Sequence, residues 1–162
     1  MKKILLLFVF VFSSLVSCTQ EETTTYYLIR HAEKNLTKKN PNLIEEGIKR
    51  ANNWATYFKD IPLDAVYTTN FNRTKQTAAP TATHKGLKPI IYKPNKLYTT
   101  TFKKRTKGKT TLIVGHSNTI PFLVNKIIGE NKYDEIDESN YANLYIIHIS
   151  GDKITASLQQ IN

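Results

Sequence analysis

The sequence predicts one α/β domain, a three-layer sandwich in which helices flank a mainly parallel sheet with an antiparallel hairpin at its C-terminal edge. Three observations predict this fold. The chain has 162 residues, which suits a single hydrophobic core. Short strand-like runs alternate with stretches of helical spacing, a pattern typical of a parallel sheet covered on both faces. Two more strand-like runs near the C-terminus are separated only by the turn sequence Ser150-Gly151-Asp152-Lys153.

The first half of the chain carries two strand–helix pairs. Residues 25–29 are aromatic and branched and predict a buried strand. Residues 42–59 repeat apolar side chains at helical spacing, and the strand-like run 64–68 follows them. Residues 72–83 predict a second helix that carries its alanines on one face.

The second half repeats the alternation and ends in the hairpin. The stretch Lys93–Gly108 is basic, and we expect it to be partly helical and to form a wall or lid over the substrate. A further helix is expected from about Ser117 to Ile128. The remaining strands are expected at 89–92, 110–114, 144–149 and 154–158.

The N-terminus has the pattern of an export signal. Lys2 and Lys3 precede an apolar run over residues 4–12, which is too short for a membrane span of about 20 residues. Leu15-Val16-Ser17-Cys18 resembles the lipobox of bacterial lipoproteins, in which the cysteine becomes the lipidated N-terminus. An ordinary signal peptide with an incidental cysteine is the alternative.

This resemblance divides the chain into a signal peptide over 1–17, a lipidated tether over 18–24 and a domain over 25–162. Lipidation of Cys18 would place the mature protein in the bacterial cell envelope, anchored to a membrane and facing outside the cytoplasm. Because Cys18 is the only cysteine, the sequence excludes an internal disulfide framework, a four-cysteine zinc site and an iron–sulfur cluster.

Charge is distributed unevenly along a chain whose formal net charge is +10. Between Ala65 and Gly129 there are 12 lysines and arginines and no aspartate or glutamate. Such a segment presents a positive field to anions, although solvated lysines on a helix face would give the same count. No helix-turn-helix, zinc-finger or aromatic-rich RNA-binding motif is present, so a nucleic-acid partner is not expected.

Two histidines follow predicted strands at the same edge of the sheet. His31 comes two residues after Ile29, and His116 comes two residues after Val114. Ligands of parallel α/β sheets bind beyond the carboxyl ends of the strands. Ser117 follows His116 at the start of a predicted helix, where free N–H groups favour an anion.

Two arginines are expected at this edge as well. Arg30 precedes His31, and Arg73 lies at the start of the helix that follows the second strand. Guanidinium groups are planar, charged donors whose geometry matches phosphate oxygens. Arg30, His31, Arg73 and His116 are therefore expected to converge on one positively charged pocket.

Three blocks carry a family resemblance: Leu28-Ile29-Arg30-His31-Ala32-Glu33-Lys34, Arg73-Thr74-Lys75-Gln76-Thr77-Ala78, and Val114-Gly115-His116-Ser117-Asn118-Thr119. In this order they resemble the three sequence blocks of the histidine phosphatase superfamily, which also contains the phosphoglycerate mutases. The resemblance covers Tyr26 to about Ile149, and the opening block is of a small Arg-His-Ala-Glu type.

The resemblance implies a metal-independent phosphomonoester hydrolase of the histidine acid phosphatase type. His31 would attack phosphorus, and water would then hydrolyse the phosphohistidine. Arg30, Arg73, His116 and Ser117 would hold the phosphoryl oxygens, so no metal or other cofactor is expected. Because the nucleophile must be neutral, we expect the second ring nitrogen of His31 to donate to a backbone carbonyl or a similar acceptor.

This chain departs from the family at one point. Many members protonate the leaving alcohol with a carboxylate after the second block, whereas this chain has none from Ala65 to Gly129. Glu33 is the nearest substitute in sequence, and a salt bridge to a lysine or arginine is its alternative role. A carboxylate from residues 130–138, folded over the site, is another candidate. Without a donor, aryl phosphates should react faster than alkyl phosphates.

The competing interpretation is a non-catalytic surface lipoprotein that binds phosphorylated or other anionic ligands. Such a protein would keep both arginines but would not need His31 and His116 at strand ends. In the catalytic interpretation the expected partners are a phosphorylated small molecule or glycolipid substrate, together with the membrane through the lipid anchor.

Overall fold

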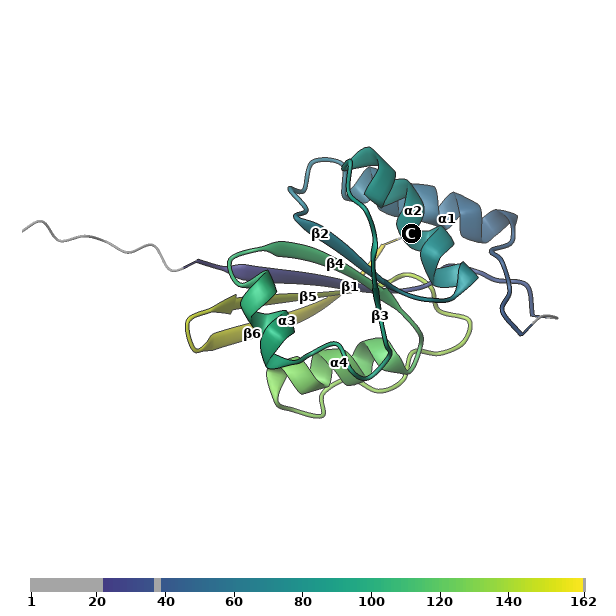
Figure 1. The fold of residues 1–162 in the computed structure, drawn as a ribbon. Coiled ribbons are helices and arrows are strands. Elements are labelled where there is room, and N and C mark those ends of the chain that lie inside the picture. Colours follow the sequence, from purple (N-terminus) through teal and green to yellow (C-terminus); the bar gives the residue numbers. More distant parts are fainter. Residues whose placement is uncertain (1–21, 37–38, 162) are drawn as a thin grey trace, which may run out of the picture.

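A six-stranded sheet in the order β3-β2-β4-β1-β5-β6 forms the centre of the computed structural model, which describes residues 22–36 and 39–161 (Figure 1). The parallel strands are β1 (Thr24–Arg30), β2 (Ala65–Thr69), β3 (Ile90–Tyr92) and β4 (Thr110–Gly115). The antiparallel edge consists of β5 (Asn143–Ser150) and β6 (Lys153–Gln160). The predicted fold class is confirmed, whereas the expected signal peptide and Cys18 lie outside the described residues.

Helices cover both faces of the sheet. On one face α1 (Glu45–Tyr57) packs beside α2 (Asn72–His84), and the other face carries α3 (Thr100–Thr106) and α4 (Thr119–Ile128) (Figure 1). None of the described helices is both long and apolar enough to cross a membrane.

Two helix boundaries differ from the sequence prediction. The first helix begins at Glu45 rather than at residue 42, because Leu43 pairs with Lys34 in an isolated β-bridge and holds this segment extended. The last helix begins at Thr119 rather than at about Ser117. There the Thr119 hydroxyl accepts a hydrogen bond from the backbone N–H of His116 at 3.1 Å, which leaves His116 and Ser117 in the turn before the helix.

The sheet buries apolar side chains on both of its faces, as a three-layer fold requires. The core beneath α1 and α2 includes Trp54, Phe58, Val66, Ala78 and Leu112. The core beneath α3 and α4 includes Tyr26, Phe102, Ile113, Ile120 and Tyr145. Both cores include residues of β1 and β4, so these two strands are packed on both faces. The side chains at their ends are therefore held in fixed positions.

The segment that leaves β1 is held against both helices of its face. An ideal Cβ on Gly47 of α1 would lie only 2.1 Å from the carbonyl oxygen of Glu33, so the helix can approach this closely only with glycine there. The hydroxyl of Thr77 accepts from the N–H of Ala32 at 2.9 Å and donates to the carbonyl of Arg73 at 2.7 Å. These contacts fix the positions of the residues around His31.

Candidate active site

The carboxyl ends of three neighbouring strands bring the predicted site residues together. Arg30 pairs with Gly115 in the parallel register of β1 and β4, and the N–H of His31 donates to the Gly115 carbonyl at 2.9 Å. The rings of His31 and His116 consequently lie 5.5 Å apart between centroids, inclined by 69°. The neighbouring strand β2 ends at Thr69, whose hydroxyl contacts His116.

His31 is held as a neutral imidazole with a defined tautomer. Its side chain is buried, and its Nδ1 lies 2.8 Å from the carbonyl oxygen of Ala32. A carbonyl can only accept, so Nδ1 carries the proton and Nε2 carries the lone pair. Burial, reinforced by the positive charges of Arg30 and Arg73, lowers the pKa of His31 to about 3. The backbone acceptor expected from the sequence is present.

His116 is oriented by contacts to both of its ring nitrogens. Nη2 of Arg73 lies 3.2 Å from Nδ1, and Oγ1 of Thr69 lies 3.0 Å from Nε2. Since arginine can only donate, Nδ1 accepts, and the Nε2 proton points to the Thr69 hydroxyl. Burial, together with the charges of Arg73, Arg30 and Lys34, lowers the pKa of His116 to about 4.

Arg73 reaches the site from the first turn of α2. Its guanidinium carbon lies 4.5 Å above the ring of Phe71, and that ring in turn contacts His116 edge-on at 5.1 Å between centroids. Burial lowers the pKa of Arg73, and the nearby charge of Arg30 adds to this effect. The buried Nε of Arg73 has no hydrogen-bond partner in the described part of the chain, so it remains available to an anion.

Arg30 is only 1% exposed and is anchored by the loop before β5. Its Nη1 donates to the carbonyl oxygens of Asp137, Glu138 and Asn140 at 2.9, 3.1 and 2.9 Å. Its guanidinium carbon lies 4.2 Å above the ring of Tyr141. The loop therefore positions one edge of the guanidinium, and Nη2 is directed to a different partner.

That partner is the carboxylate of Glu138. Oε2 accepts from Nη2 of Arg30 at 2.7 Å, and Oε1 accepts from the Ser117 hydroxyl at 2.7 Å. The Ser117 hydrogen bond, helped by the charges of Arg30 and Lys34, lowers the pKa of Glu138. An ionised carboxylate thus accepts hydrogen bonds from Arg30 and Ser117, two of the groups that were expected from the sequence to bind phosphate.

Glu33 faces α1. Its Oε1 accepts from Nε of Arg50 at 2.8 Å, and the side chain lines a hollow together with Glu46, Lys49, Arg50 and Asn53. The salt bridge to an arginine, which the sequence left as the alternative to proton donation, is therefore formed.

The expectation that Lys93–Gly108 walls the substrate site is wrong for residues 100–108, which carry four of its six cations. The helix α3 and residues 107–109 lead directly into the amino end of β4, whereas His116 follows the carboxyl end. The six residues of β4 separate the two ends by about 17 Å at a rise of 3.3 Å per residue. The sequence pattern revealed this charge but not the end of the sheet on which it lies.

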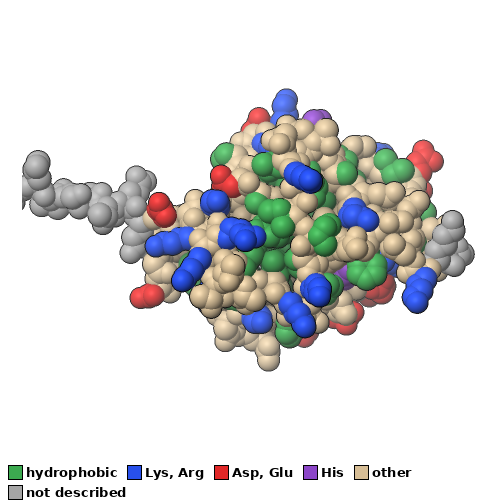
Figure 2. Space-filling model, in the orientation of Figure 1, with side chains coloured by type: hydrophobic (Ala, Val, Ile, Leu, Met, Phe, Trp, Pro, Cys, Tyr) green, Lys and Arg blue, Asp and Glu red, His purple; other side chains and the backbone are tan. Residues whose placement is uncertain are grey.

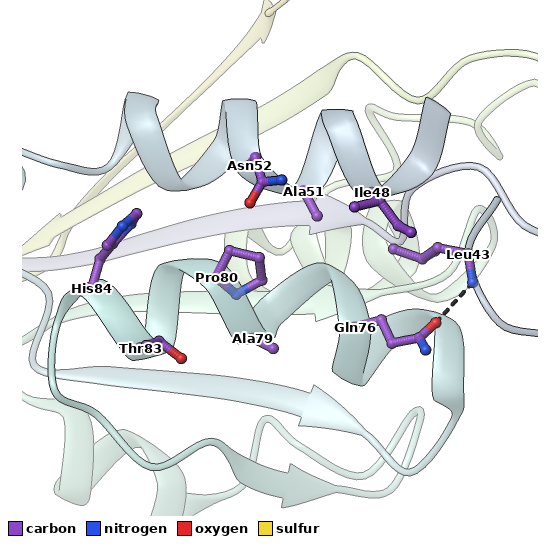
Figure 3. Close-up of a pocket in the computed structure, with 9 residues that line it drawn as sticks. All are labelled: Leu43, Ile48, Ala51, Asn52, Gln76, Ala79, Pro80, Thr83 and His84. Atoms are coloured by element: carbon purple, nitrogen blue, oxygen red, sulfur yellow. Dashed lines mark hydrogen bonds between the residues drawn. The ribbon is translucent and has the colours of Figure 1, made fainter. Parts of the chain in front are cut away.

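A groove between α1 and α2 is separate from the site. It has a volume of about 520 Å³, and the residues that line it include Leu43, Ile48, Ala51, Gln76 and Pro80 (Figure 3). His84 lies at the end of this groove, on the last residue of α2, and none of the four converging residues contributes to its lining.

Three residues that contact the site residues were not predicted individually from the sequence. Thr69 and Tyr141 were not singled out, and Glu138 was included only as the end of a range. Each acts through a contact between distant parts of the chain, and no spacing rule reveals such a contact. Within the described residues, no group of three or more His, Cys, Asp or Glu side chains could hold a metal ion.

Residues 26–95 match the histidine phosphatase superfamily, branch 1. No curated protein matches the chain closely enough to count as a relative. The fold resembles solved structures at low sequence identity. The protein histidine phosphatase SixA, complexed with tungstate, shares 14% identity with a TM-score of 0.68 over 84% of this chain and 96% of its own.

Two further structures are similar. YhfR from Bacillus stearothermophilus shares 17% identity with a TM-score of 0.67, over 86% of this chain and 98% of its own. A phosphoserine phosphatase mutant from Entamoeba histolytica, in complex with phosphoserine, shares 17% identity with a TM-score of 0.63, over 83% and 96% of the two chains. The family model thus matches the part of the chain that carries Arg30, His31 and Arg73, and the three solved structures share the fold over more than four fifths of the chain.

Proposed function

We propose that this protein is a metal-independent phosphomonoester hydrolase that works through a phosphohistidine on His31. The observation that carries the proposal is the hydrogen bond between Nδ1 of His31 and the carbonyl of Ala32, 2.8 Å long. This bond fixes the ring so that the Nε2 lone pair is free, and the low pKa keeps the ring neutral at physiological pH.

In the first step Nε2 of His31 attacks phosphorus and the bond to the ester oxygen breaks, which gives a phosphohistidine and a leaving alkoxide or aryloxide that takes its proton from water. Arg30, Arg73 and Ser117 donate to the phosphoryl oxygens. His116, whose Nδ1 lies beside Arg73, can take up a proton when the negative phosphoryl group approaches and then donate as well. Preorganised donors of this kind are commonly worth about 3 kcal/mol each in the transition state.

In the second step water attacks the phosphohistidine and releases inorganic phosphate, and His31 regains its neutral form. The same donors stabilise both transition states, because the charge on the phosphoryl oxygens is similar in the two steps. No step requires a metal, since the positive charge is supplied by the two guanidinium groups.

Phosphate binding has to displace the Glu138 carboxylate from Arg30 and Ser117. The carboxylate is well suited to this exchange because its side chain is 68% exposed and can turn into solvent. Arg30 keeps its position during the exchange, since three loop carbonyls still hold Nη1.

The leaving group is expected to be a good one. Glu33 is paired with Arg50, and hydrogen bonding and positive charge keep Glu138 ionised, so neither is suited to protonate an alkoxide. Aryl phosphates, and phosphorylated nitrogen of the kind that the protein histidine phosphatase SixA is named for, leave more readily than alkyl phosphates. The substrate is therefore a phosphorylated small molecule, glycolipid or phosphorylated side chain whose leaving group needs little protonation.

We also propose that Cys18 is lipidated, so that the enzyme acts at the cell envelope on substrates outside the cytoplasm. Intact-mass measurement of the mature protein tests this, because lipidation adds the mass of the acyl groups at a new N-terminal cysteine, whereas an ordinary signal peptide leaves none.

The test of the catalytic proposal is hydrolysis of para-nitrophenyl phosphate in EDTA by the parent protein and by His31→Ala. The parent should turn over without added metal, and the variant should lose at least about a thousandfold in kcat. Quenching with radiolabelled substrate at alkaline pH, where phosphohistidine survives, should label His31 alone. His84→Ala, at an exposed position on α2, serves as the control.

The competing anion-binding function makes a different prediction. Undetectable turnover by the parent protein, combined with tight binding of inorganic phosphate, would favour the non-catalytic lipoprotein.

A further inference from the structure

We propose that the basic surface formed by α3 and the turn after it rests on the anionic headgroups of the bilayer to which the protein is anchored. We define this basic surface by its five exposed cations, Lys103, Lys104, Arg105, Lys107 and Lys109. The inference rests on lipidation of Cys18 and is independent of the phosphatase chemistry.

The described part of the chain begins beside the basic surface. Glu22 lines a hollow of about 420 Å³ together with Lys103, Lys104 and Lys107. A Cβ on Gly108 would lie 2.8 Å from Oε2 of Glu22, so this residue is directly beside the basic surface. Cys18 is four residues earlier in the sequence and is therefore at most about 14 Å of chain away.

The basic surface has an excess of positive charge. Figure 2 shows lysine and arginine side chains gathered over α3, beside the beginning of the described chain. Among the described residues none of the five cations forms a salt bridge. Within residues 22–36 and 39–161, the acidic side chains nearby are Glu22 and Asp152, which line the same hollow, and Asp64, which accepts from the N–H of Thr110. Five cations exceed these three carboxylates, so the surface remains positive.

The catalytic site does not account for these cations. They lie at the amino end of β4, so that the length of this strand, about 17 Å, separates them from His116, and exposed charges at that distance are screened at physiological salt. An anionic membrane accounts for them, because basic clusters close to a lipid anchor are attracted to acidic headgroups within a Debye length. The hollow, which also contains Tyr98, offers an amphipathic ring of the type favoured at the membrane interface.

The orientation follows from the sheet. Acyl chains on Cys18 hold the protein at the membrane but leave it free to rotate on a short tether. Contact through the basic surface selects one orientation, in which the amino ends of the parallel strands face the bilayer. His31 and His116 then open away from the membrane, toward substrates in the aqueous phase.

Lysine footprinting on the lipidated full chain tests this orientation. The protein is reconstituted into vesicles of neutral phosphatidylcholine alone or with a third of phosphatidylglycerol, and lysines are acetylated and quantified by mass spectrometry. We expect acetylation of Lys103, Lys104, Lys107 and Lys109 to fall at least threefold on the anionic vesicles. About 1 M NaCl, which shortens the Debye length to about 3 Å, should restore it. Exposed Lys39, Lys49 and Lys75 are internal controls and should react equally on both vesicles.

Two variants with the same change of charge complete the test. Lys103→Glu/Lys104→Glu/Lys107→Glu should abolish the difference at Lys109, whereas Lys39→Glu/Lys49→Glu/Lys75→Glu should retain it. Equal acetylation of the basic surface on both vesicles overturns the proposal, and so does a mature protein without acyl groups on Cys18. Hydrolysis of para-nitrophenyl phosphate by the same vesicles reports separately on the proposed catalytic function.

Discussion

Nη2 of Arg30 donates to Oε2 of Glu138 over 2.7 Å, and this contact joins a side chain that is 1% exposed to one that is 68% exposed. Because the second carboxylate oxygen accepts from Ser117, Glu138 engages donors that a phosphoryl group would need. At the proposed phosphate site, phosphate would therefore have to compete with a carboxylate that belongs to the protein itself.

Glu138→Gln should strengthen binding of inorganic phosphate by about three- to tenfold. The substitution removes a negative charge from the phosphate subsite but leaves the loop carbonyls that position Arg30. Isothermal titration calorimetry measures the binding constant, and a lower KM for para-nitrophenyl phosphate should accompany it. Asp137→Asn makes the same change of charge in the same loop, at a carboxylate that accepts from Ser139, and should have a smaller effect. Weaker phosphate binding by Glu138→Gln would instead assign Glu138 to positioning Arg30.

Arg73→Lys should lower kcat/KM by about a hundredfold while leaving the free energy of unfolding nearly unchanged. Lysine keeps the positive charge but lacks the planar guanidinium. In the parent protein that group contacts His116 at 3.2 Å through Nη2, and its Nε is unpaired among the described residues and available to a phosphoryl oxygen. Steady-state kinetics and urea unfolding of the same preparation separate the two effects. Arg50→Lys, which alters an arginine paired with Glu33, is the matched control and should retain most of the activity.

The sequence predicted the sheet and the converging residues because both depend on local signals. Runs of apolar residues mark β1 and β4, and a polar residue directly after a parallel strand must lie at one edge of the sheet. The sequence could not identify the contact between Glu138 and Arg30, since the two residues are 108 positions apart and no spacing rule connects them. The prediction that the basic stretch forms a wall of the substrate site was wrong for a related reason, because composition does not reveal which end of a strand a neighbouring segment approaches.

Glu33→Gln should change the hydrolysis of an alkyl phosphate by less than about threefold. The carboxylate is already paired with Arg50 on the side of α1, so its loss removes a salt bridge and not a proton donor. Rates on an alkyl and an aryl phosphate should fall or rise together. A selective loss of the alkyl activity would show that Glu33 protonates the leaving group after all.

Acid should destabilise the phosphate-free protein well above the pH at which carboxylates usually titrate. Burial lowers the pKa of His31 to about 3 and that of His116 to about 4, from an ordinary value of 6.5. Between pH 6.5 and about 4 the unfolded chain therefore binds protons at these two positions that the folded chain does not bind. The free energy of unfolding should fall with decreasing pH in this range, with a slope approaching about 1.4 kcal/mol per pH unit for each histidine.

Urea unfolding at intervals between pH 7 and pH 5 measures this slope before Glu138 and the other carboxylates contribute. His116→Gln removes one of the two buried imidazoles, so its slope should be shallower by an amount that approaches about 1.4 kcal/mol per pH unit near pH 5, whatever its stability at pH 7. His84→Gln alters an exposed side chain and should retain the parent slope. Parallel curves for the parent protein and His116→Gln would mean that His116 takes up its proton in the folded state as readily as in the unfolded chain. The neutral pair on which the proposed chemistry depends would then not exist.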